Sequence, residues 1–210
     1  MKTAIVFCAA VGVVLGLGFV MIVGWSVGRG VGYDSVTHGA GAGNATGAVK
    51  TPTHVYLVIH QGEQLGNEPL GPAYLPATFT LPAYTTVTIT IINFDSATAL
   101  PANYAKYAKA SGIDKNSFQM AAMDPTNPNA KVASATMSQV EAAQVSHTFT
   151  FPELNLSVPI AAKSSTTFSF HTPAGGTYAW HCQDPCGIGP VGWGGAMSTD
   201  GYMQGHVTFA

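Results

Sequence analysis

Short segments rich in β-branched and aromatic residues recur from about residue 54 to the end of the chain, and they predict β-strands. The clearest are 54–60 (HVYLVIH) and 85–94 (TTVTITIINF), and several prolines punctuate the stretch between them. Similar segments occur at 78–81, 146–151, 166–171, 176–181 and 205–209. Several short strands separated by turn signals are typical of all-β sandwiches. The pattern therefore predicts an all-β, Greek-key β-sandwich.

The pattern changes between residues 95 and 145, where Ala, Asn, Lys and Met become frequent. We predict a partly helical insertion here, with short helices within 102–111, 117–123 and 134–145. Its residues form no recognisable catalytic motif. The simplest interpretation is a lid or a surface that docks a partner, without chemistry of its own.

The first residues follow a third pattern, since 3–28 contain no charged side chain and Lys2 and Arg29 bracket them. This run exceeds the roughly 20 residues that a membrane-spanning helix needs. A cleaved signal peptide has an apolar core of only about 7–15 residues. We therefore predict a transmembrane signal anchor at 1–29, single-pass in the cell membrane.

Two further segments follow the predicted anchor. Residues 30–48 are rich in Gly and Ala and predict a flexible tether. Residues 49–210 then form the folded domain, with the insertion at about 95–145. Because the short Met1–Lys2 end is expected to stay in the cytoplasm, the folded domain is predicted on the extracytoplasmic side.

Charge is unusually sparse in this sequence. Charged residues make up 9% of the chain, with 8 Lys and Arg, 10 Asp and Glu, and a formal net charge of −2, whereas about 25% is ordinary. No basic patch is available to bind a phosphate backbone, which argues against a nucleic-acid partner. We expect any protein partner to dock through apolar contacts rather than by electrostatic steering.

Imidazole and sulfur side chains gather in the last third of the chain. His147 begins one predicted strand, Cys182 ends a later one, Cys186 follows four positions on, and Met203 precedes the last strand. Thiolate, thioether and imidazole ligands suit copper cycling between Cu(I) and Cu(II). The chain contains no nucleophile elbow, HExxH helix or phosphate-binding loop. We therefore predict copper binding, and neither an enzyme acting alone nor a small organic substrate.

These residues resemble the cupredoxin superfamily, and in particular the copper domain of subunit II of haem–copper oxidases. That family holds a dinuclear copper centre, CuA, on a His, a Cys-x-x-x-Cys-Gly loop, a second His and a Met. The resemblance in motifs covers about 145–209. The strands predicted at 54–94 agree with the family only in their general residue pattern. It implies metal ligands at His147, Cys182, Asp184 (through its backbone carbonyl), Cys186 and Met203.

The resemblance also implies a role for the chain. A single anchor followed by one cupredoxin domain is similar to the short subunits II of some prokaryotic oxidases. It implies electron transfer in a respiratory chain, with a redox protein or haem–copper oxidase subunits as partners.

The second His of the family motif is missing from this sequence. Pro190 stands four residues after Cys186, and Asp200 stands three residues before Met203. The copper site is therefore predicted to be either mononuclear or CuA-like and dinuclear, with another side chain in place of the missing imidazole. The candidate substitutes are Met197, His206 and His181.

Two alternatives remain open at the level of the sequence. A Cys182–Cys186 disulfide would make the domain metal-free, and it would then serve as a structural subunit of an oxidase. A sulfur-rich site would instead suit copper storage or delivery.

Overall fold

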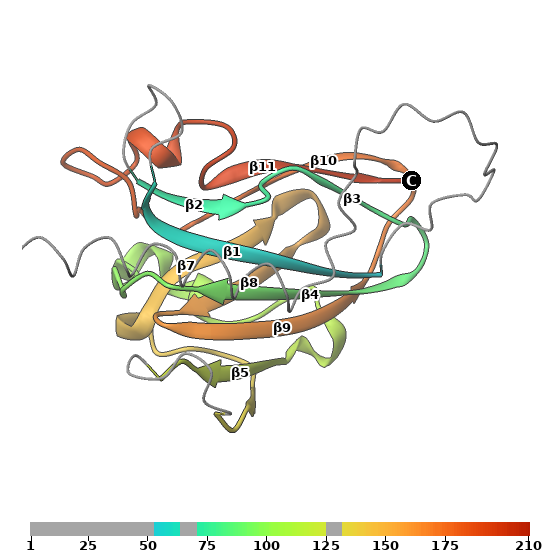
Figure 1. The fold of residues 1–210 in the computed structure, drawn as a ribbon, viewed down its shortest axis with the longest axis horizontal. Helices are drawn as coiled ribbons and strands as arrows, with labels where there is room; N and C mark the ends of the chain where they lie inside the picture. Colours follow the sequence, from blue (N-terminus) through green and yellow to red (C-terminus); the bar gives the residue numbers. More distant parts are fainter. Residues whose placement is uncertain (1–52, 64–70, 125–131) are drawn as a thin grey trace, which may run out of the picture. The chain divides into compact units, whose positions relative to one another are not determined.

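The described part of the chain forms two β-sheets. The computed structural model describes residues 53–63, 71–124 and 132–210. The six-stranded sheet has the order β2 (Gly71–Leu75), β1 (His54–Glu63), β4 (Thr86–Asn93), β9 (Ser164–His171), β5 (Phe118–Ala122), β6 (Ala135–Met137). The five-stranded sheet has the order β3 (Phe79–Leu81), β11 (Gln204–Phe209), β10 (Gly176–His181), β7 (Val145–Phe151), β8 (Leu156–Ala161). The prediction of a mostly β fold is confirmed for the described residues, and Figure 1 shows β1, β4 and β9 side by side.

Pairing within the sheets is mixed. β1 pairs with β4, and β3 pairs with β11, in parallel. The other strand pairs are antiparallel, including β4 with β9 and β7 with β8. Parallel pairs require connections that cross between distant parts of the chain, so neighbouring strands come from well-separated sequence positions.

Aromatic side chains fill the space between the sheets. The Phe149 ring lies 4.9 Å from the Trp180 ring and 5.2 Å from the Phe151 ring, between centroids. The buried polar tips also have partners, since Trp180 donates from Nε1 to the Ala77 carbonyl at 2.8 Å and the Tyr74 hydroxyl donates to the Thr148 carbonyl at 3.1 Å. The Tyr74 bond joins β2 of one sheet to β7 of the other, and the Trp180 bond ties β10 to the connection between β2 and β3. A buried hydroxyl or indole N–H without an acceptor would be costly.

The insertion differs from the prediction, because part of it is β-structure. The prediction of short helices within 117–123 and 134–145 is wrong where these ranges form β5 and β6. β5 pairs with β9, whose other edge is already occupied by β4. The backbone groups on the free edge of β9 need partners, and this long-range pairing overrides the local helical preference of an Ala- and Met-containing segment.

Helical structure in the described residues consists of short 3₁₀ turns. These turns are η1 (Ala102–Ala108), η2 (Asp114–Asn116), η3 (Ala142–Gln144), η4 (Pro152–Leu154) and η5 (Gly195–Met197). η1 and η3 fall within the first and third segments for which short helices were predicted. Within the described ranges no helix is long and apolar enough to cross a membrane, and the predicted anchor and tether at 1–48 lie outside those ranges.

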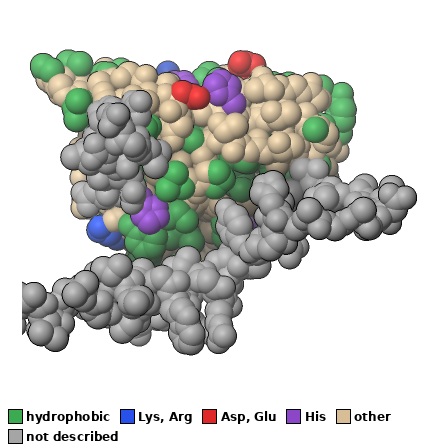
Figure 2. Space-filling model, turned by 45° about the horizontal axis from the view of Figure 1, so that its top comes forward, with side chains coloured by type: hydrophobic (Ala, Val, Ile, Leu, Met, Phe, Trp, Pro, Cys, Tyr) green, Lys and Arg blue, Asp and Glu red, His purple; other side chains and the backbone are tan. Residues whose placement is uncertain are grey.

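The surface reflects the low charge of the sequence. On the face drawn in Figure 2, charged side chains are isolated among hydrophobic and uncharged polar groups. Exposed apolar side chains include Ile188 and Val191, which are 56% and 70% exposed in the connection between β10 and β11.

We predict that Gly205→Ala destabilises the fold by about 1–3 kcal/mol, the usual effect of overpacking a core. A Cβ on Gly205 would lie 2.1 Å from the Ala77 carbonyl oxygen, which is the acceptor of the Trp180 bond. Urea unfolding measures the effect. Gly175→Ala is the matched control, because its Cβ would meet the Phe209 oxygen at 3.4 Å; equal losses in the two variants would contradict this account of the packing.

Candidate metal centre

The candidate ligands lie on two adjacent strands and on the connection that follows them. His147 belongs to β7, and Cys182 immediately follows β10. The connection 182–203 then returns to β11, and its base is closed by a hydrogen bond from the Cys182 N–H to the Met203 carbonyl at 2.8 Å. In Figure 1 this connection lies at the end of the sheets away from the C-terminus.

One imidazole and two thiols converge in this region. His147 Nδ1 lies 3.2 Å from Cys186 Sγ, and the two Sγ atoms are 3.8 Å apart. The three ligand atoms all lie within 4.8 Å of one another, and in the described part of the chain this is the one such group of His, Cys, Asp or Glu. His147 and Cys182 are fully buried, Cys186 is half-buried, and both cysteines are free thiols.

A thioether completes the cluster of soft donor atoms. The Cys186 thiol donates to Met197 Sδ at 3.3 Å. Met197 ends η5, and a close approach of Gly187 to Gly194 holds η5 against the cysteine loop. A Cβ on Gly187 would lie 2.1 Å from the Gly194 oxygen and 2.9 Å from Met197 Cγ. Only glycine fits at position 187, and its absence of a side chain lets Met197 reach Cys186.

Met203 and Asp184 lie beside the cluster in different ways. Met203 is buried, and its backbone bonds to Cys182 and to Ala196, while the sulfur that contacts a thiol belongs to Met197. The Asp184 carbonyl accepts from the Cys186 N–H at 2.7 Å and lies 3.5 Å from Cys182 Sγ. The metal-ligand roles of Met203 and of the Asp184 carbonyl stay predictions.

The other two substitute candidates have partners elsewhere. The His181 ring nitrogens lie 3.2 and 3.0 Å from the Gln183 side-chain amide. His206 is half-exposed, and its Nδ1 lies 3.7 Å from the Asp200 carboxylate. Of the three candidates named from the sequence, Met197 is the one whose donor atom contacts a thiol.

A carboxylate that the sequence analysis did not single out orients the His147 ring. Asp95 Oδ2 lies 3.1 Å from His147 Nε2, so that Nδ1 faces the thiols. Asp95 is itself held by the Ser96 N–H, which donates to Oδ1 at 2.7 Å. A carboxylate on the far nitrogen of a ligating imidazole fixes its orientation and raises its basicity. The signal available in the sequence was only that Asp95 follows a predicted strand.

Backbone N–H groups surround the Cys182 sulfur. The Thr148 N–H donates to Cys182 Sγ at 3.3 Å, and the Asp184 N–H donates to it at 3.4 Å. Hydrogen bonds to a sulfur favour its anionic form over the neutral thiol. These bonds come from backbone positions, which no residue pattern in the sequence reveals.

The protonation of the cluster follows from these contacts. Burial lowers the pKa of His147, but the Asp95 hydrogen bond and the neighbouring Cys182 outweigh it and raise the pKa to about 9. Burial raises the pKa of Cys182, but hydrogen bonds from Cys186 and His147 hold it well below its usual value. The hydrogen bond to Cys182, with burial, raises the pKa of Cys186. An imidazolium and one thiolate therefore form together. The Cys186 thiol carries one hydrogen, so it donates either to the Cys182 thiolate or to Met197 Sδ.

The insertion contributes a second polar group, Thr98. Its hydroxyl lies 2.8 Å from the Ser146 carbonyl oxygen and 2.7 Å from Asp184 Oδ2. A hydroxyl carries one hydrogen, so both bonds are made only when a protonated Asp184 donates to Thr98. Burial raises the pKa of Asp184 to about 6, which favours this neutral form in mild acid. With Asp95 and Thr98 in these positions, the interpretation of 95–145 as a cap without chemistry is incomplete.

The donor set fits a single soft metal ion. Two sulfurs bound at about 2.3 Å in tetrahedral geometry would be separated by roughly 3.8 Å, and the observed separation is 3.8 Å. Two thiols, a thioether and an imidazole are ligands that suit copper. Zinc is the other metal that accepts such thiolate and imidazole ligands.

Comparisons with known proteins identify low-similarity neighbours among solved structures. No family model matches the chain, and no curated protein matches it. Sodium-dithionite-reduced auracyanin from Roseiflexus castenholzii is 16% identical to this chain. The match covers 76% of this chain and 98% of the auracyanin chain, with a TM-score of 0.35. A purple cupredoxin from Nitrosopumilus maritimus is 15% identical, covering 74% and 98%, with a TM-score of 0.28.

A third neighbour is auracyanin A, a "blue" copper protein from Chloroflexus aurantiacus. It is 16% identical to this chain, and the match covers 76% of this chain and 99% of the auracyanin A chain, with a TM-score of 0.33. At these TM-scores the likeness assigns neither a family nor a metal to this chain.

We predict that Asp95→Asn weakens metal binding by about 10–100-fold, because the His147 ring loses the carboxylate that orients it. A competition titration of Cu(I) against a chromophoric chelator measures the affinity. Asp114→Asn is the matched control, since Asp114 is an exposed carboxylate in η2. An unchanged affinity in Asp95→Asn would show that the orientation of His147 does not depend on Asp95.

Proposed function

We propose that this chain is a cupredoxin-like copper protein that transfers single electrons at a cell membrane. The observation that carries the proposal is the convergence of His147 Nδ1 with the Cys182 and Cys186 thiols within 4.8 Å, at one end of a two-sheet β-structure. The contact of Met197 Sδ with Cys186 adds a fourth soft donor.

Strands and hydrogen bonds hold two of the donor residues of the site in place. His147 is held by β7 and by Asp95, and Cys182 by the backbone bond to Met203. When bound, copper supplies a one-electron couple between Cu(I) and Cu(II). A donor atom fixed by sheet pairing, as in His147, moves little when the charge of the site changes, which favours fast electron transfer.

We propose that the site holds one copper ion. A CuA-like pair would need a second imidazole, and the two candidates in the described residues, His181 and His206, bond elsewhere. His147, Cys182, Cys186 and Met197 together provide four donors, which is enough for one four-coordinate ion.

The surface beside the site supports an apolar route to a redox partner. Ile188 and Val191 lie in the same connection as Cys186 and are largely exposed. Together with the predicted anchor at 1–29, this favours a partner held at the same membrane, such as the other subunits of a haem–copper oxidase. Docking through such groups depends only weakly on salt.

The test is a copper titration of the full chain, purified in mild detergent under reducing conditions. A Cys8→Ala background removes the third cysteine, so that thiol signals come from Cys182 and Cys186 alone. We expect one copper per chain, a thiolate-to-Cu(II) absorption band after oxidation, and reversible reduction. Cys182→Ser should abolish the band.

The other outcomes of the titration each contradict part of the proposal. Two coppers sharing one unpaired electron in the EPR spectrum would indicate a CuA-like centre. Tight Cu(I) binding without reversible oxidation would indicate storage or delivery. Absence of copper binding, with both thiols of a chain purified without reductant protected from alkylation until reduction, would indicate the disulfide-bonded structural subunit.

The role of Met197 has its own matched test. We predict that Met197→Leu weakens Cu(I) binding more than Met203→Leu does, because the Met197 thioether contacts Cys186. Leucine conserves the volume of methionine, so both variants are expected to fold. The same Cu(I) competition titration compares the two affinities. A larger loss in Met203→Leu would instead support the ligand assignment implied by the oxidase resemblance.

A further inference from the structure

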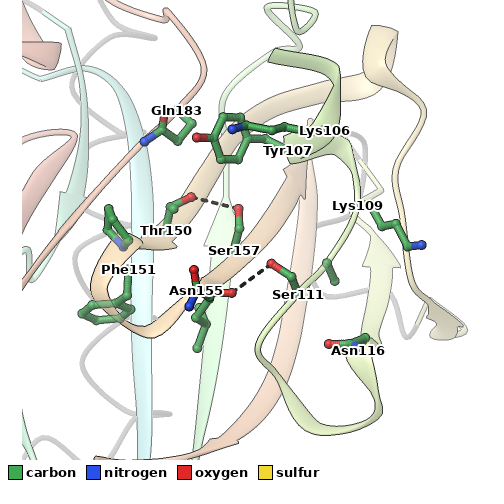
Figure 3. A pocket seen from close by; sticks show the side chains of 13 residues that line it. Lys106, Tyr107, Lys109, Ser111, Asn116, Thr150, Phe151, Asn155, Ser157 and Gln183 are labelled. Carbon is green, nitrogen blue, oxygen red and sulfur yellow. Dashed lines mark hydrogen bonds between the residues drawn. The ribbon is translucent and has the colours of Figure 1, made fainter. Parts of the chain in front are cut away.

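A cavity separate from the metal centre lies between η1 and the turn that joins β7 to β8. It has a volume of about 670 Å³. Figure 3 shows Gln183, Tyr107 and Lys106 at one end of it and the Thr150–Ser157 pair in its interior. Gln183 directly follows Cys182, so the metal-site loop contributes one residue to the lining of the cavity.

The lining of this cavity is positively charged, which is unusual for a chain with so few charges. It includes Lys106 and Lys109, and among the described residues no carboxylate lines it. The Lys106 ammonium lies 4.8 Å from the centre of the Tyr107 ring. Within the described ranges neither lysine has an ion pair with a carboxylate. The carboxylates nearest to lining residues along the chain are Asp114, Glu153 and Asp184, and all three lie outside the lining.

The interior of the cavity offers hydroxyl groups. The hydroxyls of Thr150 and Ser157 lie 2.9 Å apart, and both residues are almost fully buried. Ser111 donates to the Asn155 carbonyl at 3.1 Å, on the side nearer Lys109 and Asn116 in Figure 3. Ammonium and hydroxyl donors together are the groups that bind oxyanions.

A chain of hydroxyls links this cavity to the Cys182 sulfur. Thr150 Oγ1 lies 3.2 Å from Thr148 Oγ1, and Thr148 Oγ1 lies 4.0 Å from Cys182 Sγ. The Gln183 N–H also donates to Thr148 Oγ1, at 2.7 Å. Each hydroxyl carries one hydrogen, so the direction in which Ser157 donates sets the direction along the whole chain. An acceptor placed in the cavity would turn these hydrogens away from Cys182.

From these contacts we infer that the cavity binds a small organic or inorganic molecule with two or more oxyanion groups. Its binding would reverse the direction of the hydrogen bonds along Ser157, Thr150 and Thr148, and this change would reach Cys182. The volume exceeds what a single small ion fills. Lys106 lies at the end of the cavity near Gln183, and in Figure 3 the ammonium end of Lys109 points away from the Thr150–Ser157 pair. No small organic substrate was expected from the sequence, so such a ligand goes beyond that expectation. The binding site does not depend on the proposed copper function, because all of its groups lie outside the cluster of donor atoms.

The test uses isothermal titration calorimetry on the full chain in mild detergent at about 0.15 M salt, which screens distant charges. The protein is kept reduced and metal-free, because both probes, pyrophosphate and citrate, chelate copper. Binding of pyrophosphate over citrate would identify phosphate chemistry, and the reverse would identify carboxylate chemistry. Absence of heat from either probe at millimolar concentrations would overturn the inference.

Matched variants locate the site. Lys106→Gln should weaken binding roughly tenfold or more, the usual effect of losing a charge-assisted hydrogen bond. Lys115→Gln removes the same charge from η2, outside the lining, and should weaken binding by less than about twofold. Equal losses in the two variants would show that net charge, and not this cavity, attracts the probe.

NMR measures whether binding in the cavity affects the hydroxyl chain and Cys182. Saturating probe should shift the amide resonance of Cys182, which does not line the cavity, in the unaltered chain. Thr148→Val interrupts the hydroxyl chain outside the lining and should reduce that shift while binding persists. An undiminished Cys182 shift in Thr148→Val would overturn the inference that binding reaches Cys182. Copper binding that fails in the separate titration leaves these measurements interpretable, since none of them uses metal.

Discussion

Burial of the His147 imidazole beside two thiols depends on a buried counter-charge, and Asp95 supplies it. A charged imidazole without a partner would be expelled from a core or would lose its proton. With Asp95 Oδ2 at 3.1 Å, the ring keeps a raised pKa and presents Nδ1 to Cys186. With the proton on His147, Cys182 is a thiolate, so the imidazolium lies between two anionic groups, Asp95 and Cys182.

The sheets set the positions of the groups in this cluster. β7 carries His147 and, with the opposite side-chain orientation, the Thr148 and Thr150 hydroxyls. One strand therefore presents the imidazole to the metal centre and the hydroxyl chain to the neighbouring cavity. The insertion at 95–145 supplies Asp95 and Thr98 to the first site and Lys106 and Lys109 to the second. It belongs to both sites and extends the six-stranded sheet.

Much of the fold was predictable because its strands are encoded locally, in β-branched and aromatic runs such as 54–60 and 85–94. β5 was missed because Phe118–Ala122 contains residues with good helix propensity, and only pairing with β9 makes it a strand. His147, Cys182 and Cys186 were found because their residue types are chemically distinctive. Asp95 was missed because its contact with His147 spans 52 positions of sequence. The contact of Met197 with Cys186 depends on the approach of Gly187 to Gly194, which spacing does not encode.

X-ray absorption at the copper edge of the copper-loaded full chain tests the central claim most directly. The account predicts one nitrogen and three sulfur scatterers around a single copper, from His147, Cys182, Cys186 and Met197, with no copper–copper scattering. Met197→Leu should remove one sulfur from that shell, and Met203→Leu should leave it intact. A copper–copper distance in the spectrum, or two imidazole nitrogens in the first shell, would contradict the account.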